Sequence, residues 1–327
     1  MARRFPLGPL LAAVAIAFSW AAHAQGYPDR PVTLVVPFAA GGATDTLARQ
    51  FAERMARNAR HPIIVENVAG AGGTVGATRV AKAKADGYTL LVGHVGYMAA
   101  APSLYKQLAY DPAQDFDAVA RFPDTPMVLI AARSGPHQRL DSLVDLARKQ
   151  PGQVNIANAG VGSAGHLVAA LFASALKIDV VHVSYKGNAP ALTDILGGQV
   201  DGMFDQSNTA LPQVRGEKVV ALAVTSRDRL PQMPDVPTLA ETVLPGFEAA
   251  TWYGIYAPRG TPREAIAWLG ARFAEAMQDA AFTSKLVEQG YVMIRPELRG
   301  PEALAAHTRS EIELWRKVIA DAKIPPN

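Results

Sequence analysis

Four glycine-containing loops of the sequence have the composition of anion-binding sites. They span residues 37–45, 67–73, 158–165 and 184–188, and each follows a predicted strand. Glycine allows successive backbone N–H groups to converge on one point, and the start of a helix adds about half a positive charge. Such a nest of amides binds an anion without arginine, and Lys186 is the one cationic residue in these loops. The loops therefore predict a site for an anion held mainly by the backbone.

The same loop residues also have simpler explanations. Glycine permits tight turns, and Asp45 fits a helix N-cap that accepts backbone N–H groups. A turn role explains any single loop as well as ligand binding does, but three glycine-rich loops ahead of helices favour a shared ligand. The residues that the loops themselves nominate are Gly41, Gly42, Gly70, Gly72, Gly73, Gly160, Gly162 and Lys186.

Enzymatic chemistry finds little support in the sequence. Residues 160–165 match the G-x-G-x-x-G pattern of dinucleotide sites, but the next strand ends at Lys186 without an Asp or Glu for the ribose hydroxyls. Ser163 lacks the first glycine of a nucleophile elbow, and His166 at a helix start fits hydrogen bonding or packing better than base catalysis. The remaining mature histidines lack the spacing of metal ligands. The sequence predicts no catalytic residue, no cofactor and no metal; a dinucleotide-dependent enzyme is the weakest alternative.

The elements that must position these loops alternate between strand and helix. Residues 32–36 form an apolar, β-branched run typical of a strand buried on both faces, and Leu47, Phe51 and Met55 follow at helical spacing. Repeated units of this kind predict an α/β fold with parallel sheets covered by helices. Further strands are expected at 63–65, 88–92, 127–132, 154–157, 180–183, 200–204, 219–224 and 252–256, and helices at 74–84, 140–148, 166–176, 190–196, 262–289 and 301–322.

Two runs of strand–helix units predict two lobes, each a doubly wound sheet, with a cleft between them. Residues 25–125 and 229–327 are expected to form the first lobe, and residues 126–228 an inserted second lobe. The chain is expected to cross between the lobes near 122–132 and again near 219–230. Open sheets bind ligands beyond the carboxyl ends of their strands, so the four loops should meet in this cleft.

The N-terminus has the form of an export signal rather than of part of the fold. Arg3 and Arg4 precede an apolar run, and residues 22–24 supply a small-x-small cleavage site. Losing both arginines lowers the formal charge from +3 to +1, because 30 basic and 29 acidic residues remain. The charge therefore gives no support to a nucleic-acid partner. The absence of cysteine excludes disulfides, thiolate metal sites and a lipid anchor of the bacterial type. We expect cleavage near Ala24 and an exported protein.

A series of short motifs, in this order, resembles the Bug (TctC-like) family of periplasmic receptors of tripartite tricarboxylate transporters. The resemblance covers essentially the whole mature chain. The motifs lie at residues 37–45, 67–73, 86–91, 185–187, 191–194, 197–201, 203–205, 221–226, 234–238 and 245–247.

The resemblance implies a type II periplasmic-binding fold that closes around a small organic carboxylate held by backbone amides and water. It implies a monomer that hands its ligand to membrane permease subunits or, alternatively, to a sensor kinase of a two-component system. His94 stands where relatives usually have a small hydroxyl residue, which makes ligand contact and a position at the rim equally reasonable. The residues carried over are Phe38, Ala40, Gly41, Gly42, Thr44, Asp45, Gly70, Gly72 and Gly73 in the first lobe, with Gly162, Ser163, His166 and Asp205 in the second.

Overall fold

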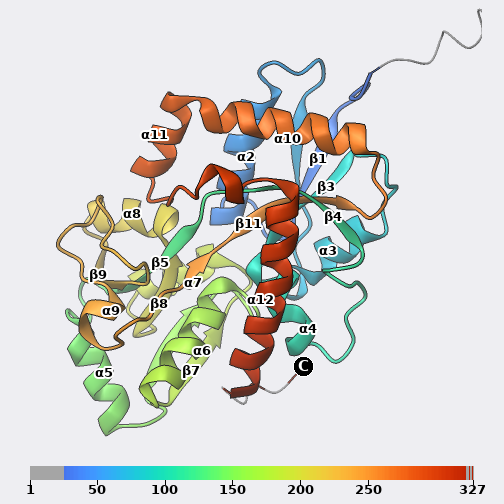
Figure 1. Ribbon diagram of the computed structural model, residues 1–327. Coiled ribbons are helices and arrows are strands. Elements are labelled where there is room, and N and C mark those ends of the chain that lie inside the picture. Colours follow the sequence, from blue (N-terminus) through green and yellow to red (C-terminus); the bar gives the residue numbers. More distant parts are fainter. Residues whose placement is uncertain (1–25, 322–323, 325, 327) are drawn as a thin grey trace, which may run out of the picture.

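The computed structural model describes residues 26–321, 324 and 326 and folds them into two α/β lobes (Figure 1). Each lobe is built around one sheet. The two-lobe fold that the sequence predicted is confirmed. The export signal expected at residues 1–24 lies outside the described residues. Within the described part of the chain, no helix is both long and apolar enough to cross a membrane.

The sheet of the first lobe has the strand order β2-β1-β3-β11-β4. β1 pairs in parallel with β2 and β3, whereas β11 runs antiparallel to β3 and β4. The strands are β1 (Val32–Val36), β2 (Ile63–Asn67), β3 (Thr89–His94), β4 (Phe116–Arg121) and β11 (Tyr253–Pro258). The helices of this lobe are α2 (Ala43–Ala56), α3 (Thr74–Ala81), α4 (Ala101–Leu104), α10 (Arg263–Gln278), α11 (Ala280–Glu288) and α12 (Pro301–Asp321), with short turns η1 (Ala71–Gly73), η2 (Gly96–Ala100) and η3 (Pro296–Leu298).

Helices cover both faces of this sheet, which explains its continuously apolar strands. On one face α2, α10 and α11 pack against alternate residues of β1. Phe51 stacks there on Phe273 with ring centroids 5.1 Å apart and meets Phe122 edge-on at 4.6 Å. The opposite face is covered by α3, η2 and α12, and Figure 1 shows α12 running down the front of the molecule.

The sheet of the second lobe has the order β10-β5-β8-β6-β7, and β9 also pairs with β5. β6 is parallel to β7 and β8, but β5 is antiparallel to β8, β9 and β10. Both sheets are therefore mixed rather than wholly parallel. The strands are β5 (Thr125–Ala132), β6 (Val154–Asn158), β7 (Val180–Ser184), β8 (Gly202–Gln206), β9 (Val219–Val224) and β10 (Ala250–Thr251). The helices are α5 (Leu140–Lys149), α6 (Ala164–Leu176), α7 (Asn188–Leu196), α8 (Ser207–Arg215) and α9 (Leu239–Thr242).

The chain returns to the first sheet later than the sequence analysis expected. β9 and β10 both pair with β5, so the chain re-enters the first sheet only at β11. Thr225 ties the two short strands together: its carbonyl accepts from the N–H of Ala249 at 2.9 Å, and its hydroxyl donates to the Ala249 carbonyl at 2.6 Å. These bonds hold both ends of the segment 226–249, here called the excursion, beside the second sheet.

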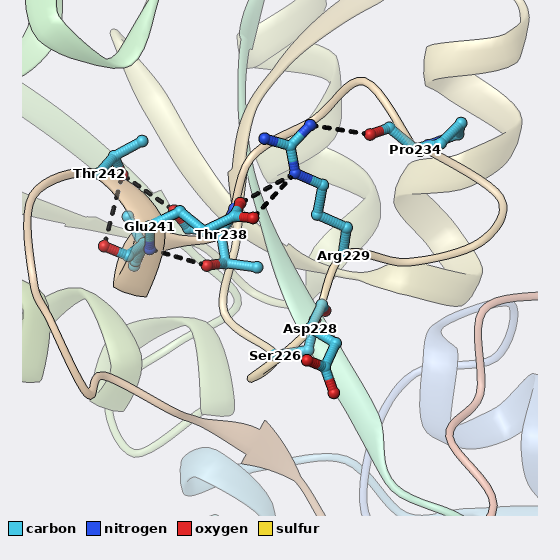
Figure 2. A network of polar contacts seen from close by, with 8 residues as sticks. Ser226, Asp228, Arg229, Pro234, Thr238, Glu241 and Thr242 are labelled. Carbon is cyan, nitrogen blue, oxygen red and sulfur yellow. Dashed lines mark hydrogen bonds and ion pairs between the residues drawn. The ribbon is translucent and has the colours of Figure 1, made fainter.

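A polar network keeps this excursion ordered (Figure 2). Thr238 and Glu241 form a capping box at the start of α9, each side chain accepting from the backbone N–H of the other residue. The Arg229 guanidinium donates to both Glu241 oxygens, at 3.1 and 2.9 Å, and to the Pro234 carbonyl at 3.0 Å. The segment is therefore a fixed part of the second lobe rather than a free linker.

Polar side chains brace both crossings between the lobes. Between β4 and β5, the Arg121 guanidinium donates to both carboxylate oxygens of Asp124, at 2.9 and 3.0 Å. Between β10 and β11, the indole N–H of Trp252 donates to Glu311 of α12 at 2.8 Å. Two short, nearly continuous strand pairs thus join the lobes, which is the arrangement of a hinge.

Candidate functional site

A cavity of about 70 Å³ lies where loops of the two lobes face one another. One buried water needs roughly 10–15 Å³, so the cavity has room for a small molecule. Seven of the predicted ligand-binding residues line it, namely Phe38, Ala40, Gly42, Thr44, His94, Ser163 and Lys186. The other lining residues are Ala39, Ala43, Met127, Ala159, Ala164, Gly165, Gly187, Asn188, Ala189, Pro190, Phe204 and Gln206.

Three helices begin at the wall of this cavity. α2 starts after Gly42 in the first lobe, while α6 starts after Ser163 and α7 after Gly187 in the second lobe. The first N–H groups of a helix have no partner inside the helix, and each helix start carries about half a positive charge. Among the described residues that line the cavity there is no Asp or Glu. The arrangement is therefore suited to an anion.

His94 contributes a neutral hydrogen-bond donor to the wall. Its ring Nδ1 accepts from the backbone N–H of Gly96 at 2.9 Å, so the proton of the neutral ring resides on Nε2. Burial lowers the pKa of His94 to about 3. The ring is fixed between aromatic neighbours, stacked on Tyr97 and edge-on to Phe38, with centroid separations of 5.5 Å in both cases.

Two predicted site residues, Asp45 and Asp205, do not line the cavity. The Asp45 carboxylate is buried and accepts from the Gly41 N–H at 2.9 Å, from Arg49 at 3.0 Å and from Asn67 at 2.9 Å. Gly42 occupies the N-cap of α2 and Asp45 lies in its first turn, so the N-cap interpretation of Asp45 is wrong. Asp45 instead ties the loop ahead of α2 to β2.

Asp205 lies behind the wall, where it holds other residues in place. Its Oδ1 accepts from the Asn188 side-chain amide at 2.7 Å, from the Thr209 hydroxyl at 2.6 Å and from the Gln206 N–H at 2.8 Å. Its Oδ2 is buried without a partner among the described residues, and burial raises the pKa of this carboxyl. Asp205 therefore organises two residues that do line the cavity.

The remaining predicted residues shape the loops instead of facing the cavity. Gly160 and Gly162 adopt positive φ values of 124° and 80° ahead of α6, and the Gly162 N–H donates to Nδ1 of His166 at 3.3 Å. Gly70, Gly72 and Gly73 likewise have positive φ. Gly41, also at positive φ, donates its N–H to Asp45. None of these residues is among those that line the cavity.

The two lobes meet closely beside the cavity. A Cβ placed on Gly72 would lie 2.4 Å from the Val161 carbonyl oxygen, and one on Gly96 would lie 2.1 Å from that of Gly162. Hydrogen bonds also cross between the lobes: the phenol of Tyr253 donates to Oε1 of Gln206, and the Ser207 hydroxyl donates to the Gly290 carbonyl at 2.8 Å. The structure therefore has its lobes closed over the site.

Sequence reasoning missed several lining residues, notably Met127, Asn188 and Gln206. Asn188 follows the predicted loop glycine Gly187 and opens α7, and Gln206 directly follows Asp205 at the end of β8. Their position at a strand end or a helix start was the available signal. No signal in the sequence indicated Met127, because an apolar residue inside a buried strand has the pattern of core.

Buried histidines make the stability of the fold depend on pH. Burial lowers the pKa of His94 to about 3, and burial followed by the neighbouring His182 lowers that of His166 to about 4, whereas an unfolded histidine titrates near 6.5. The unfolded state therefore binds more protons between pH 6.5 and 4, so stability is complete above pH 6.5 and falls as the pH is lowered. At pH 5 we expect a loss of about 2 kcal/mol for each histidine.

Thermal melting between pH 7.5 and 4.5 checks this expectation. His94→Gln, which preserves an acceptor for the Gly96 N–H, should reduce the slope of melting temperature against pH by about a quarter to a third, because burial also lowers the pKa values of His166, His182 and His307. The comparison of variant with wild type isolates His94 from other groups, such as Asp205, whose raised pKa acts in the opposite sense. An unchanged slope would show that His94 is protonated in the fold.

Two α/β lobes, joined by paired crossing strands and enclosing a site built from helix starts, define a periplasmic binding protein. The family model described as the tripartite tricarboxylate transporter family receptor (TctC) matches residues 47–321. The chain belongs to this TctC/Bug family of periplasmic binding proteins, a family of receptors and not of enzymes, as the sequence motifs indicated.

Individual relatives cover nearly the whole chain. A UPF0065 protein from the tcbD-tcbE intergenic region of a Pseudomonas species is 36% identical over 99% of this chain and 96% of its own. The solved structure of MatC from Rhodopseudomonas palustris with bound malate is 42% identical, with a TM-score of 0.85, and covers 90% of this chain and 100% of that chain. Rpa4515 of R. palustris with adipate is 36% identical, with a TM-score of 0.87, over 92% and 100%.

Proposed function

We propose that this protein captures a small organic carboxylate, in particular a dicarboxylate, between its lobes and delivers it to the permease of a tripartite tricarboxylate transporter. The convergence of three helix starts on one interlobe cavity carries the proposal. The relatives with malate and adipate both hold dicarboxylates. The export signal expected at residues 1–24 accords with a periplasmic location.

The distribution of the helix starts favours a ligand that is anionic at both ends. α2 belongs to the first lobe, whereas α6 and α7 belong to the second. A carboxylate bound only by one lobe leaves the hinge free, but a dicarboxylate that touches both lobes binds the closed form more tightly than the open form. Only such differential binding shifts the equilibrium towards closure. Closure then presents one surface of defined shape to the membrane partner.

Backbone amides supply enough free energy for this task. A hydrogen bond to a charged group contributes about 1.5–3 kcal/mol. Four or five such bonds to carboxylate oxygens give roughly 6–15 kcal/mol before the cost of association is subtracted. Micromolar affinity requires about 8 kcal/mol net, which the upper end of this range supplies after an association cost of about 4–7 kcal/mol, with Ser163 and His94 adding further donors.

A thermal-shift panel of mono-, di- and tricarboxylates tests the proposal. A ligand with micromolar Kd, present at 1 mM, stabilises the folded state by about 4 kcal/mol and should raise the melting temperature by about 6 °C for a chain of this length. Calorimetric titration of each compound that shifts the transition would give its affinity. A panel in which no carboxylate shifts the transition would contradict the proposal. Uptake that is unchanged after deletion of the receptor gene would favour a sensor kinase as the partner.

A further inference from the structure

We infer that Asn188, held in place by Asp205, selects ligands that carry a hydroxyl group beside a carboxylate. This inference rests on the proposed function, because it names which carboxylates the same cavity prefers. It follows from which donor and acceptor atoms of the side chains at the cavity wall already have a hydrogen-bond partner within the protein.

Asn188 presents an acceptor to the cavity. It is the first residue of α7 and lines the cavity, whereas Asp205 does not. The Asn188 Nδ2 donates to Oδ1 of Asp205 at 2.7 Å. Asp205 is 1% exposed and is itself fixed by Thr209 and by the Gln206 N–H. One proton of its nitrogen is committed behind the wall, so the Asn188 amide offers a ligand one remaining N–H and the oxygen Oδ1, and that oxygen accepts hydrogen bonds but cannot donate them.

Three other polar side chains at the wall, those of Gln206, Ser163 and His94, present donors. Oε1 of Gln206 accepts from the Tyr253 phenol, which leaves its Nε2 free to donate. Oγ of Ser163 accepts from the His166 N–H at 3.4 Å, which leaves its proton free. Nδ1 of His94 accepts from Gly96, so Nε2 carries the proton. Together with the helix starts, these donors suit the carboxylate oxygens, which only accept.

Asn188 Oδ1 therefore cannot form a hydrogen bond with a carboxylate oxygen, because both only accept, but it can accept one from a hydroxyl group. A hydroxyl donates its one proton to Asn188 and accepts from a neighbouring donor. An unsubstituted dicarboxylate offers no donor to Oδ1 of the half-buried Asn188, which a site pays for in affinity. An ammonium brings three protons and a positive charge to a wall of donors, close to Lys186, with no Asp or Glu among the described lining residues. The expected order of affinity is hydroxyl, then hydrogen, then ammonium.

Malate, succinate and aspartate test this order, because they share a four-carbon dicarboxylate chain and differ only at one carbon. By calorimetric titration we expect malate to bind about 10-fold more tightly than succinate and at least about 100-fold more tightly than aspartate. In Asn188→Leu the preference of malate over succinate should fall to about 2-fold or less. Asn155→Leu is the matched control: Asn155 also donates to an aspartate of the second lobe, Asp201, at 3.3 Å, but does not line the cavity, and its loss should keep the preference.

The role of Asp205 as a positioning residue is tested through the same ratio of affinities. Asp205→Asn retains an oxygen that accepts from Asn188 and should keep the preference, whereas Asp205→Leu should lose it. A merely structural defect would weaken malate and succinate alike and leave their ratio unchanged. Melting curves without ligand show which variants fold, and Asn188→Leu decides if Asp205→Leu does not fold.

Several outcomes would overturn the inference. Equal binding of malate and succinate by the wild type would contradict the inference that Asn188 selects a hydroxyl group. An unchanged ratio of the malate and succinate affinities in folded Asn188→Leu would contradict it as well. Both results leave the proposed receptor function intact. Tight binding of aspartate does the same. If none of the three dicarboxylates binds while another carboxylate does, the inference fails alone. If no carboxylate of any kind binds, the proposed function fails together with it.

Discussion

Replacement of Gly96 by alanine is expected to lower the affinity for the ligand at least about 100-fold while leaving both lobes folded. Gly96 belongs to η2 in the first lobe, and its added Cβ would lie 2.1 Å from the carbonyl oxygen of Gly162 in the second lobe. Real Cβ atoms essentially never come within 3.0 Å of another heavy atom. Because both partners are backbone, the lobes themselves must separate. A population of closed molecules reduced 100-fold reduces the apparent affinity by the same factor.

Gly270→Ala provides the matched control for this substitution. Gly270 lies in α10 of the same lobe, and a Cβ there meets nothing within 4 Å. The second neighbour of a Cβ at Gly96 is Nδ1 of His94 at 3.1 Å, a contact within one lobe that small shifts relieve. Calorimetric titration gives the affinities, and small-angle scattering with ligand should show Gly96→Ala remaining more extended than the wild type. Full affinity in Gly96→Ala would mean that the closed contact between η2 and the loop before α6 is not needed for binding.

Replacement of Ser163 by aspartate is expected to lower the affinity about 1000-fold without destabilising the protein. Ser163 is the N-cap of α6, where its side chain accepts from the His166 N–H. Aspartate caps helices as well as serine does, so the helix should keep its stability. The new carboxylate, however, occupies the cavity wall within about 4 Å of the ligand's own. At an effective dielectric constant near 20, two like charges at this distance repel by about 4 kcal/mol, which corresponds to about 1000-fold in Kd.

Arg139→Asp separates the effect of position from the effect of charge. Arg139 is the N-cap of α5, also in the second lobe, and α5 does not line the cavity. This variant makes the protein more negative than Ser163→Asp does, yet it should bind ligand with wild-type affinity. Melting temperatures without ligand should stay within a few degrees of the wild type for both variants. Unimpaired binding by Ser163→Asp would place the carboxylate of the ligand away from the start of α6.

Much of the arrangement of strands and helices was predictable because strands buried on both faces have continuous apolar sequences. β1, β3 and β5 lie at or near the expected positions for this reason. β4 was missed because Asp117 and Arg121 interrupt its apolar pattern at the edge of the sheet. α8 was missed because Pro212 lies inside it, and proline normally ends a helix. The late return to the first sheet depends on the bonds between Thr225 and Ala249, which no local pattern reveals.

The sequence allowed us to predict most of the loops that form the candidate site, but not which side chains of those loops face the cavity. Glycine and small residues at strand ends indicated four loops, and three of them, 37–45, 158–165 and 184–188, contribute residues to the cavity wall, whereas 67–73 contributes none. Which side chain faces the cavity depends on contacts between loops that are distant in sequence. Asp205 was expected at the ligand because it ends a strand, yet Asn188, 17 positions earlier, reaches in front of it and takes its place at the wall.

The three helix starts at the cavity have a consequence for the medium in which the protein works. The periplasm follows the salinity of the surroundings, and dissolved ions weaken attraction between exposed charges over a Debye length of about 8–10 Å. A ligand held by lysines and arginines at the surface would be released as salinity rises. In the binding mode proposed above, the attraction comes from helix starts at a cavity between the lobes, where buried dipoles are screened less than surface charges, and Lys186 at its edge is exposed. We therefore expect the affinity of such a receptor to change less with salinity than that of a receptor whose ligand is held by surface lysines and arginines.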